Sequence, residues 1–286
     1  MEQDYLTKAT VEGVRIYALR TTNLVRQAAK MHHCSHVASA ALGRAMTGAL
    51  LLAATMKDGE RVNLRFAGNG SIGEIIADAE GSSVRGYVAN PNVFLPLKDG
   101  KLDVGGAVGK GNLVVTRYLQ NAEPFTGYCE LKNGEIADDL TYYLFKSEQT
   151  PASVALGVLV APEGEVVAAG GFFIQAMPGA KDEVLEKLEN NVLRIPYITH
   201  LLDMGYTPEK IIEILGQGLK VNFKENIAVQ FKCRCSKERV KNALAALDKK
   251  SLQEMGQDEV TEAHCDFCNT TYTFTKAEID AILKCK

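Results

Sequence analysis

The chain has 286 residues, of which 46% are hydrophobic and 23% charged, and its formal net charge at pH 7 is -3. This length suits one large domain with a smaller appendage, and the composition is that of an ordinary soluble globular protein. The small negative charge gives no electrostatic basis for binding nucleic acid or an anionic membrane, so neither is expected as a partner.

The beginning of the chain and its most apolar stretch bear on localisation. The first twenty residues carry scattered charges and lack the apolar core of a signal peptide, which favours a cytoplasmic protein. Residues 45–56 hold 12 uncharged positions between Arg44 and Lys57, whereas a membrane span needs about 20. A buried helix is therefore expected at residues 45–56.

Residues 1–178 are predicted to form an α+β domain with a mainly antiparallel sheet and packed helices. Apolar residues alternate in 14–20 and 61–68, as they do in half-buried strands. Residues 37–56 are rich in Ala and Leu and contain two glycines, which suits a helix packed closely against a sheet. Residues 153–179 predict two buried strands around a turn.

Residues 179–231 are predicted to form a linker of short amphipathic helices. Thr207 followed by Pro208 is typical of a helix start, and Gly205 is placed to end the preceding helix. The apolar faces, expected to lie on the first domain, contain these residues: Val184, Leu188, Val192, Leu201, Ile211 and Leu215.

Three other motifs do not lead to a function. Residues 68–73 match the dinucleotide-binding fingerprint, but the pattern that follows predicts a hairpin where the fingerprint needs a helix. Residues 105–112 lack the spacing of a phosphate-binding loop. His32 and His36 could grip a metal at a helical spacing, although a solvated helix end is the simpler interpretation.

Three scattered cysteines have no obvious chemical role. Cys34 and Cys129 are interpreted as core thiols. Cys285 lies near the end of the sequence, where a thiol can be exposed.

Two tight cysteine pairs near the C-terminus predict a metal site. Cys233 and Cys235 are separated by 29 residues from the second pair, Cys265 and Cys268. Four thiolates around one ion is the closed arrangement of structural zinc, and His264 could substitute only if one of the four did not bind. We therefore predict a zinc-binding domain at 232–286, in which one Zn²⁺ supplies folding free energy that so small a core lacks.

The sequence resembles a known family over its whole length. "CRCSKER" and "CDFCNTTYTFT", with "ASAALGRAMTGALLLAA", "SEQTPASVALGVLV" and "GGFFIQAMPG", are similar to the bacterial thirty-three-kilodalton chaperonins, which are redox-regulated heat-shock holdases. The resemblance implies that the four cysteines hold one Zn²⁺ in the reduced, inactive protein. It further implies that oxidants form disulfides between Cys233 and Cys235 and between Cys265 and Cys268, with zinc release and unfolding of the tail and linker. The active form would then bind unfolding client proteins without ATP, as a homodimer.

Two function classes compete with a holdase. A zinc-ribbon nucleic-acid binder is one, but residues 231–286 carry ten Lys or Arg against nine Asp or Glu, a net charge of only +1. A thiol oxidoreductase using Cys265 and Cys268, or a zinc enzyme, is the other; the closed site and the lack of a catalytic constellation argue against an enzyme.

Overall fold

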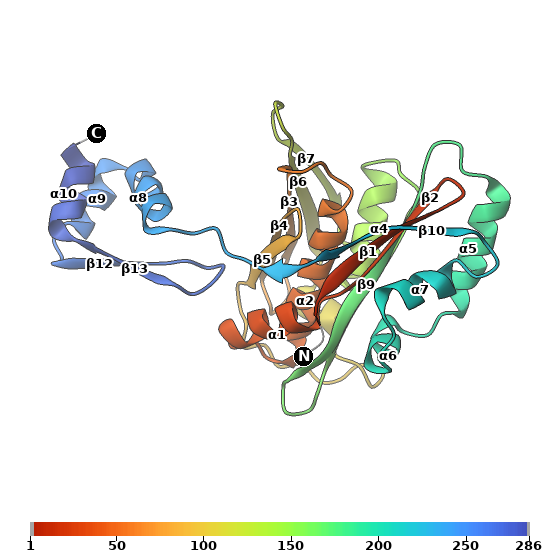
Figure 1. The fold of residues 1–286 in the computed structure, drawn as a ribbon. Coiled ribbons are helices and arrows are strands. Elements are labelled where there is room, and N and C mark those ends of the chain that lie inside the picture. Colours follow the sequence, from red (N-terminus) through yellow and green to blue (C-terminus); the bar gives the residue numbers. More distant parts are fainter. Residues whose placement is uncertain (1–2, 285–286) are drawn as a thin grey trace. The chain divides into compact units, whose positions relative to one another are not determined.

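The computed structural model describes residues 3–284 and divides the chain into two compact units, Met1–Lys232 and Cys233–Lys286 (Figure 1). The first unit holds two sheets and seven helices among its described residues, and the second holds a hairpin and three helices. The α+β class predicted from the sequence is confirmed.

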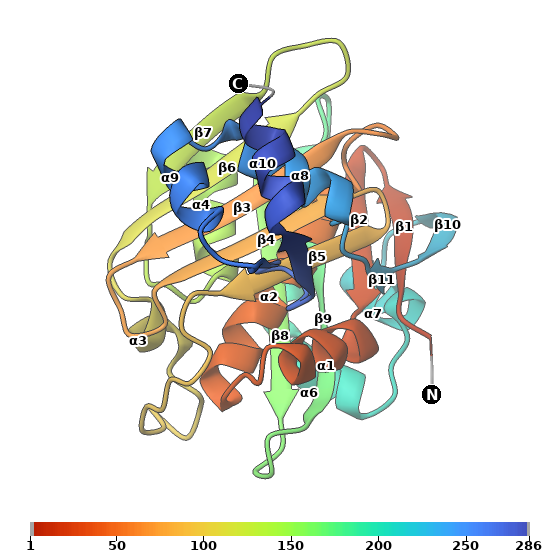
Figure 2. The same ribbon diagram turned by 90° about the vertical axis from the view of Figure 1, so that its left-hand side faces the viewer.

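Nearly all strand pairs of the first unit are antiparallel. One sheet has five strands in the order β10 (Val221–Ala228), β1 (Tyr5–Val11), β2 (Val14–Arg20), β9 (Val166–Ala176) and β8 (Ala152–Val160). The other has six, in the order β11 (Gln230–Phe231), β5 (Ser83–Val88), β4 (Glu74–Glu80), β3 (Arg61–Gly68), β6 (Gly111–Tyr118) and β7 (Phe125–Glu130). The run from β5 to β7 is seen face-on in Figure 2, and the pairing of β11 with β5 is parallel.

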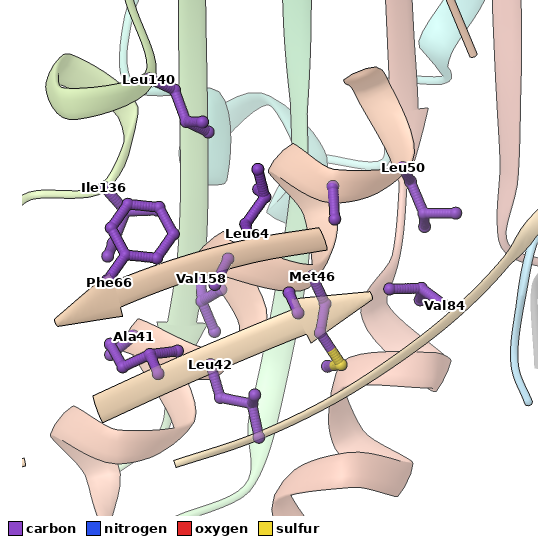
Figure 3. Close-up of a cluster of buried hydrophobic side chains, with 14 of the residues drawn as sticks. Ala41, Leu42, Met46, Leu50, Leu64, Phe66, Val84, Ile136, Leu140 and Val158 are labelled. Atoms are coloured by element: carbon purple, nitrogen blue, oxygen red, sulfur yellow. The ribbon is translucent and has the colours of Figure 1, made fainter. Parts of the chain in front are cut away.

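Helix α2 (His36–Ala53) lies between the two sheets and forms the centre of the core (Figures 1 and 3). Its length and composition would allow it to span a membrane, but 89% of its residues are buried inside the structure. The expectation of a buried helix is therefore confirmed. Gly43 allows close packing, because a Cβ there would lie 2.5 Å from Val25 and 2.7 Å from Val158.

Three further helices of the first unit lie beside this core. They are α1 (Thr22–Met31), α3 (Val104–Val108) and α4 (Ala137–Lys146). The glycine-rich turn at 68–73 packs against α3: the N–H of Gly70 donates to the carbonyl of Val108 at 2.9 Å, and that of Ile72 to Ala107 at 3.0 Å. The turn then leads into the hairpin of β4 and β5, as the sequence predicted, so the dinucleotide fingerprint is excluded.

The opposite face of the five-stranded sheet is covered by α5 (Asp182–Arg194), α6 (Ile198–Asp203) and α7 (Pro208–Leu215). Thr207 caps α7 through its side chain and Gly205 has a φ of +81°, as expected for the start of one helix and the end of another. The buried side chains of these helices are Val184, Leu188, Ile198, Leu201, Leu202, Ile211, Ile212 and Leu215. The predicted docking of amphipathic helices on the first domain is confirmed.

The expectation of a helical linker over residues 179–231 is wrong for its last part. Residues 221–228 form β10, which pairs with β1 along its whole length, and β11 then joins the second sheet. Most side chains of β10 are exposed, and the alternation of its apolar residues Val221, Phe223 and Ile227 is interrupted by Glu225, so its strand pattern is weak. The free edge of β1 makes this segment a strand.

The second unit has a hairpin and three short helices around a small core. The hairpin joins β12 (Val260–His264) to β13 (Thr271–Thr275), and the helices are α8 (Lys237–Ala246), α9 (Lys249–Met255) and α10 (Lys276–Lys284). Its buried apolar residues are Leu244, Leu252, Phe274, Ile279 and Ile282. Lys237 links α8 to α10 through Glu278 at 2.8 Å and lies 5.1 Å above the ring of Phe274.

Glu209, in the first turn of α7, joins that helix to the sheet. Its carboxylate accepts hydrogen bonds from Tyr5 of β1 at 2.8 Å, from Thr7 at 3.2 Å and from Asn226 of β10 at 2.6 Å. Burial alone would raise the pKa of Glu209, but hydrogen bonds from its own backbone N–H and from Tyr5 lower it below its ordinary value of 4.5. The stabilisation is therefore complete above about pH 4.5 and is lost as the pH falls further.

We expect Glu209→Ala to loosen α7, since hydrogen bonds to a charged group contribute about 1.5–3 kcal/mol. Hydrogen exchange of the α7 amides should accelerate at pH 7, and the wild-type protein should show the same change only at acid pH. Glu213→Ala is the control, because Glu213 contacts only Lys210 within its own helix among the described contacts. Equal exchange in both variants would contradict the role of Glu209.

Candidate metal centre

Cys265 and Cys268 are positioned by the turn between the two strands of the small hairpin. The N–H of Cys265 donates to the carbonyl of Thr270 at 3.0 Å, and the carbonyl of Cys265 accepts from Cys268 at 3.2 Å and Asn269 at 2.8 Å. Asn269 has a φ of 55°, a conformation that Asn adopts more readily than most residues. The turn thus bends the chain so that both thiols lie on its inner side.

Cys233 and Cys235 come directly before α8. Ser236 caps that helix by accepting the N–H of Arg239 at 3.2 Å, and the guanidinium of Arg239 donates back to the carbonyl of Arg234 at 2.7 Å. These two bonds fix the short segment that carries the first cysteine pair.

All four sulfur atoms lie within 4.8 Å of one another, and each residue is half-buried. The Sγ atoms of Cys233 and Cys265 are 3.7 Å apart, and those of Cys235 and Cys268 are 3.3 Å apart. Sulfurs bound tetrahedrally to zinc at about 2.3 Å lie about 3.8 Å from one another. The four residues could therefore hold one metal ion, and none of the six described cysteines forms a disulfide.

Two hydroxyl groups lie against the sulfur cluster. Tyr272 donates to the Sγ of Cys235 at 3.0 Å, and the Oγ1 of Thr270 lies 3.2 Å from the Sγ of Cys268. Sequence analysis did not assign a role to either residue. Hydrogen bonds to ligand atoms favour the charged thiolate and orient it. These hydroxyls would therefore strengthen a cation site by contacting its sulfur ligands, without binding the ion themselves.

The four thiols differ in acidity. Burial raises the pKa of Cys265 to about 12 and also raises the pKa of Cys235. Burial acts in the same direction on Cys268, but hydrogen bonds from the side chain and backbone of Thr270 outweigh it and lower the pKa to about 7. A cation would bind these groups as thiolates, so metal binding would release their protons and weaken as the pH falls.

Other candidate ligands lie away from this cluster. The Nδ1 atom of His264 lies 2.9 Å from the Thr271 hydroxyl, and its side chain is exposed. His36 contacts the carbonyl of Pro162 at 2.8 Å. His32 is only 8% exposed, so the expectation that it lies in a solvated helix end is wrong. Within residues 3–284, the four cysteines are the sole group placed to share a metal.

The remaining cysteines are separate from the site. Cys129 is buried in the core, as predicted, and Cys34 is half-buried against it. Burial raises the pKa of Cys129 to about 11 and that of Cys34 to about 12, so neither is a reactive thiolate. Cys285 lies outside the described residues.

Known proteins resemble this chain over nearly its full length. The family described as Hsp33 protein matches residues 4–275. Relatives named 33 kDa chaperonin from Desulforamulus reducens and Bacillus subtilis are each 46% identical to it, over 99% and 98% of this chain and 98% of each relative. The crystal structure of the 33 kDa chaperonin (heat shock protein 33 homolog) from Thermotoga maritima has a TM-score of 0.89 and 38% identity, with 98% of each chain covered.

These relatives support a chaperone role, and they confirm the resemblance drawn from the cysteine motifs and the three core motifs. With a family match over most of the sequence and near-complete coverage of the relatives, the chain belongs to the Hsp33 protein family.

Proposed function

We propose that this chain is a redox-regulated, ATP-independent holdase of the cytoplasm. In its reduced, inactive form Cys233, Cys235, Cys265 and Cys268 hold one Zn²⁺. Oxidation to disulfides releases the ion and unfolds residues 233–286 together with α5–α7. An apolar surface of the first unit then binds unfolding client proteins and prevents their aggregation, with the active form a homodimer.

The observation that carries this proposal is the gathering of four thiols in a unit with little other core. Five buried apolar side chains hold residues 233–286 together among the described positions. A core of this size contributes only about 3–5 kcal/mol, whereas structural zinc contributes on the order of 10–16 kcal/mol of folding free energy. Loss of the ion would therefore remove most of the stability of this unit.

The redox step involves neighbouring thiols. Two thiolates of one pair give up two electrons and form a sulfur–sulfur bond, while one molecule of hydrogen peroxide takes these electrons with two protons and becomes two molecules of water. Pairing of Cys233 with Cys235 and of Cys265 with Cys268 consumes two peroxides. A sulfur in a disulfide is no longer a thiolate ligand. When one pair is oxidised, the remaining two thiolates cannot by themselves hold zinc in a closed four-ligand site.

The surface that α5–α7 cover would be suited to unfolded clients. Beneath the helices, the sheet presents a continuous apolar face from β1, β2 and β9. Its buried residues are Ala9, Val11, Val14, Ile16, Ala18, Ala168, Phe172 and Ile174. Helices as short as α6 and α7 are marginal in water without tertiary contacts, so once undocked they would unfold and expose this face.

The zinc site predicts a graded series of variants. Cys265→Ser should weaken zinc binding more than about 100-fold, since even loss of an outer-sphere partner costs about 10–100-fold. Tyr272→Phe removes only the hydroxyl beside Cys235, so its loss of zinc affinity should lie between about 10-fold and 100-fold. A competitive chelator titration measures both values.

Thiol protection provides a second readout of the same site. All four thiols should resist alkylation until a chelator removes the metal, because coordinated thiolates are shielded. Full zinc occupancy in Cys265→Ser, or rapid alkylation of the metal-loaded wild-type protein at Cys233 or Cys268, would refute the site.

Oxidation should act on two segments and spare the rest. After peroxide at mildly raised temperature we expect zinc release, increased binding of a hydrophobic dye, and proteolytic cleavage within 182–215 and 233–284. Residues 3–178 should stay protected, and so should β10, because it is paired with β1. Aggregation of a heat-denatured enzyme, followed by light scattering, should fall only with the oxidised protein. Suppression by the reduced, zinc-loaded form would contradict redox control.

A variant of α7 can separate the covered surface from the redox switch. Ile211 is fully buried on the sheet, so Ile211→Asp should undock α7, since a charge in an apolar interface is strongly destabilising. This full-length variant should suppress aggregation in reducing buffer with zinc still bound. Lys210→Asp introduces the same side chain at an exposed position and should remain inactive. If Ile211→Asp binds the dye and still captures no client, the covered surface is not the client site.

A further inference from the structure

Strand β8 leaves one edge of the five-stranded sheet open. The N–H of Val154 donates to the Thr141 hydroxyl of α4 at 3.1 Å, and so points away from β9. Because backbone groups alternate along an antiparallel strand, those of Leu156 and Val158 point the same way. Beyond β9, the described part of the chain offers the backbone of Leu156 and Val158 no hydrogen-bond partner.

This edge lacks the features that usually protect such strands. Edge strands commonly carry charges or proline, or are short. The nine residues of β8, ASVALGVLV, include neither a charge nor a proline, and its one irregularity falls at the end, between Leu159 and Val160. Beyond Val154, where α4 already occupies the backbone N–H, this uncharged edge is open and favours pairing with another extended chain.

A groove of about 1220 Å³ runs along this edge. One wall is the segment 93–102, and the other is the connection from α5 to α6 at 192–199. Large side chains on both walls are exposed: Phe94 to 80%, Leu97 to 63% and Tyr197 to 70%. These side chains would bury apolar surface only if something occupied the groove.

The charged groups that line the groove are already engaged. Arg44 pairs with Glu135 at 2.6 Å, and Asp138 accepts from Asn133 at 2.5 Å. Lys101 donates to the Tyr197 hydroxyl at 2.6 Å, which joins the two walls. The two positive and two negative groups that line the groove cancel in net charge, so the groove favours an occupant without net charge.

The groove is continuous with the surface that α5–α7 cover. Ile195 and Ile198 line the groove and also pack in the apolar cluster beneath those helices, and Phe172 of β9 belongs to both. Departure of α5 and α6 would therefore extend the groove across the sheet face. An occupant bound at β8 could then gain further apolar contacts without leaving the edge.

We infer that the open edge of β8 binds an extended, uncharged, apolar segment of an unfolding protein by strand addition, with Phe94 and Leu97 contacting its side chains. Main-chain hydrogen bonds would provide affinity with little sequence preference, and the apolar walls would select against folded, polar surfaces. The open part of β8, from Leu156 to Val160, spans about 17 Å at 3.3 Å per residue, enough for a client segment of about five residues. This inference rests on the proposed holdase function and names the site at which a client first binds.

The test uses the full-length protein, reduced and oxidised, and a fluorescent eight-residue peptide of alternating Val and Thr. Phe94→Asp should weaken peptide binding at least about tenfold in both states, measured by anisotropy. Phe145→Asp is the matched control: Phe145 is 67% exposed and does not line the groove, so affinity should stay within about twofold. Equal weakening by both substitutions would overturn the site.

The backbone contribution has its own probe. A depsipeptide with the same side chains, in which esters replace the amides, lacks N–H donors and should bind at least about tenfold more weakly. Equal affinity for peptide and depsipeptide would overturn strand addition.

Aggregation assays separate this inference from the proposed function. If Phe94→Asp loses the peptide but the oxidised variant suppresses aggregation as well as wild type, the groove is not the client site and the holdase function stands. If oxidised wild type binds the peptide and suppresses no aggregation, the peptide site stands and the holdase function is wrong.

Discussion

The central constraint in the first unit is a sheet that is apolar on both faces. In β9 the residues from Ala168 to Ile174 are buried without interruption, so successive side chains on opposite faces both need cover. Helix α2 covers one face, and α5–α7 together with the segments that flank them cover the second. A sheet of this kind cannot be left half-covered without exposing a surface that binds other apolar groups.

Helix α2 and helices α5–α7, which cover the two faces of the sheet, differ in how firmly they are packed. Helix α2 has 18 residues, is buried nearly all round and packs between two sheets, so it can leave only with global unfolding. Helices α5–α7 contact the sheet on one side alone, and α6 has six residues. Under the proposed function this asymmetry is what permits activity: the core that presents the binding surface survives conditions that remove its second cover.

The sequence predicted those features that follow from local pattern. Alternation identified β2 and β3, the Ala-rich run identified α2, and the spacing of Cys233, Cys235, Cys265 and Cys268 identified a group that the structure brings within 4.8 Å. What it could not predict depends on tertiary placement. Strand β10 has only an interrupted apolar alternation and forms because β1 offers an edge. Tyr272 contacts Cys235, and Glu209 contacts Tyr5. In both contacts the two residues are far apart in the sequence, and no local pattern predicts that they meet.

Strand β10 also determines what kind of opening α5–α7 can undergo. The chain between the end of β9 at Ala176 and the start of β10 at Val221 has 44 residues, since 221 − 176 − 1 = 44, and both ends stay hydrogen-bonded to the sheet. Undocked helices would thus form a closed loop, and its closure entropy rises only slowly with length. Re-docking of the helices on the sheet is an intramolecular step. Its rate depends on their high effective concentration near the sheet and does not change when the protein is diluted. A client that has been released would therefore compete for the apolar sheet face with helices α5–α7, which stay tethered beside it.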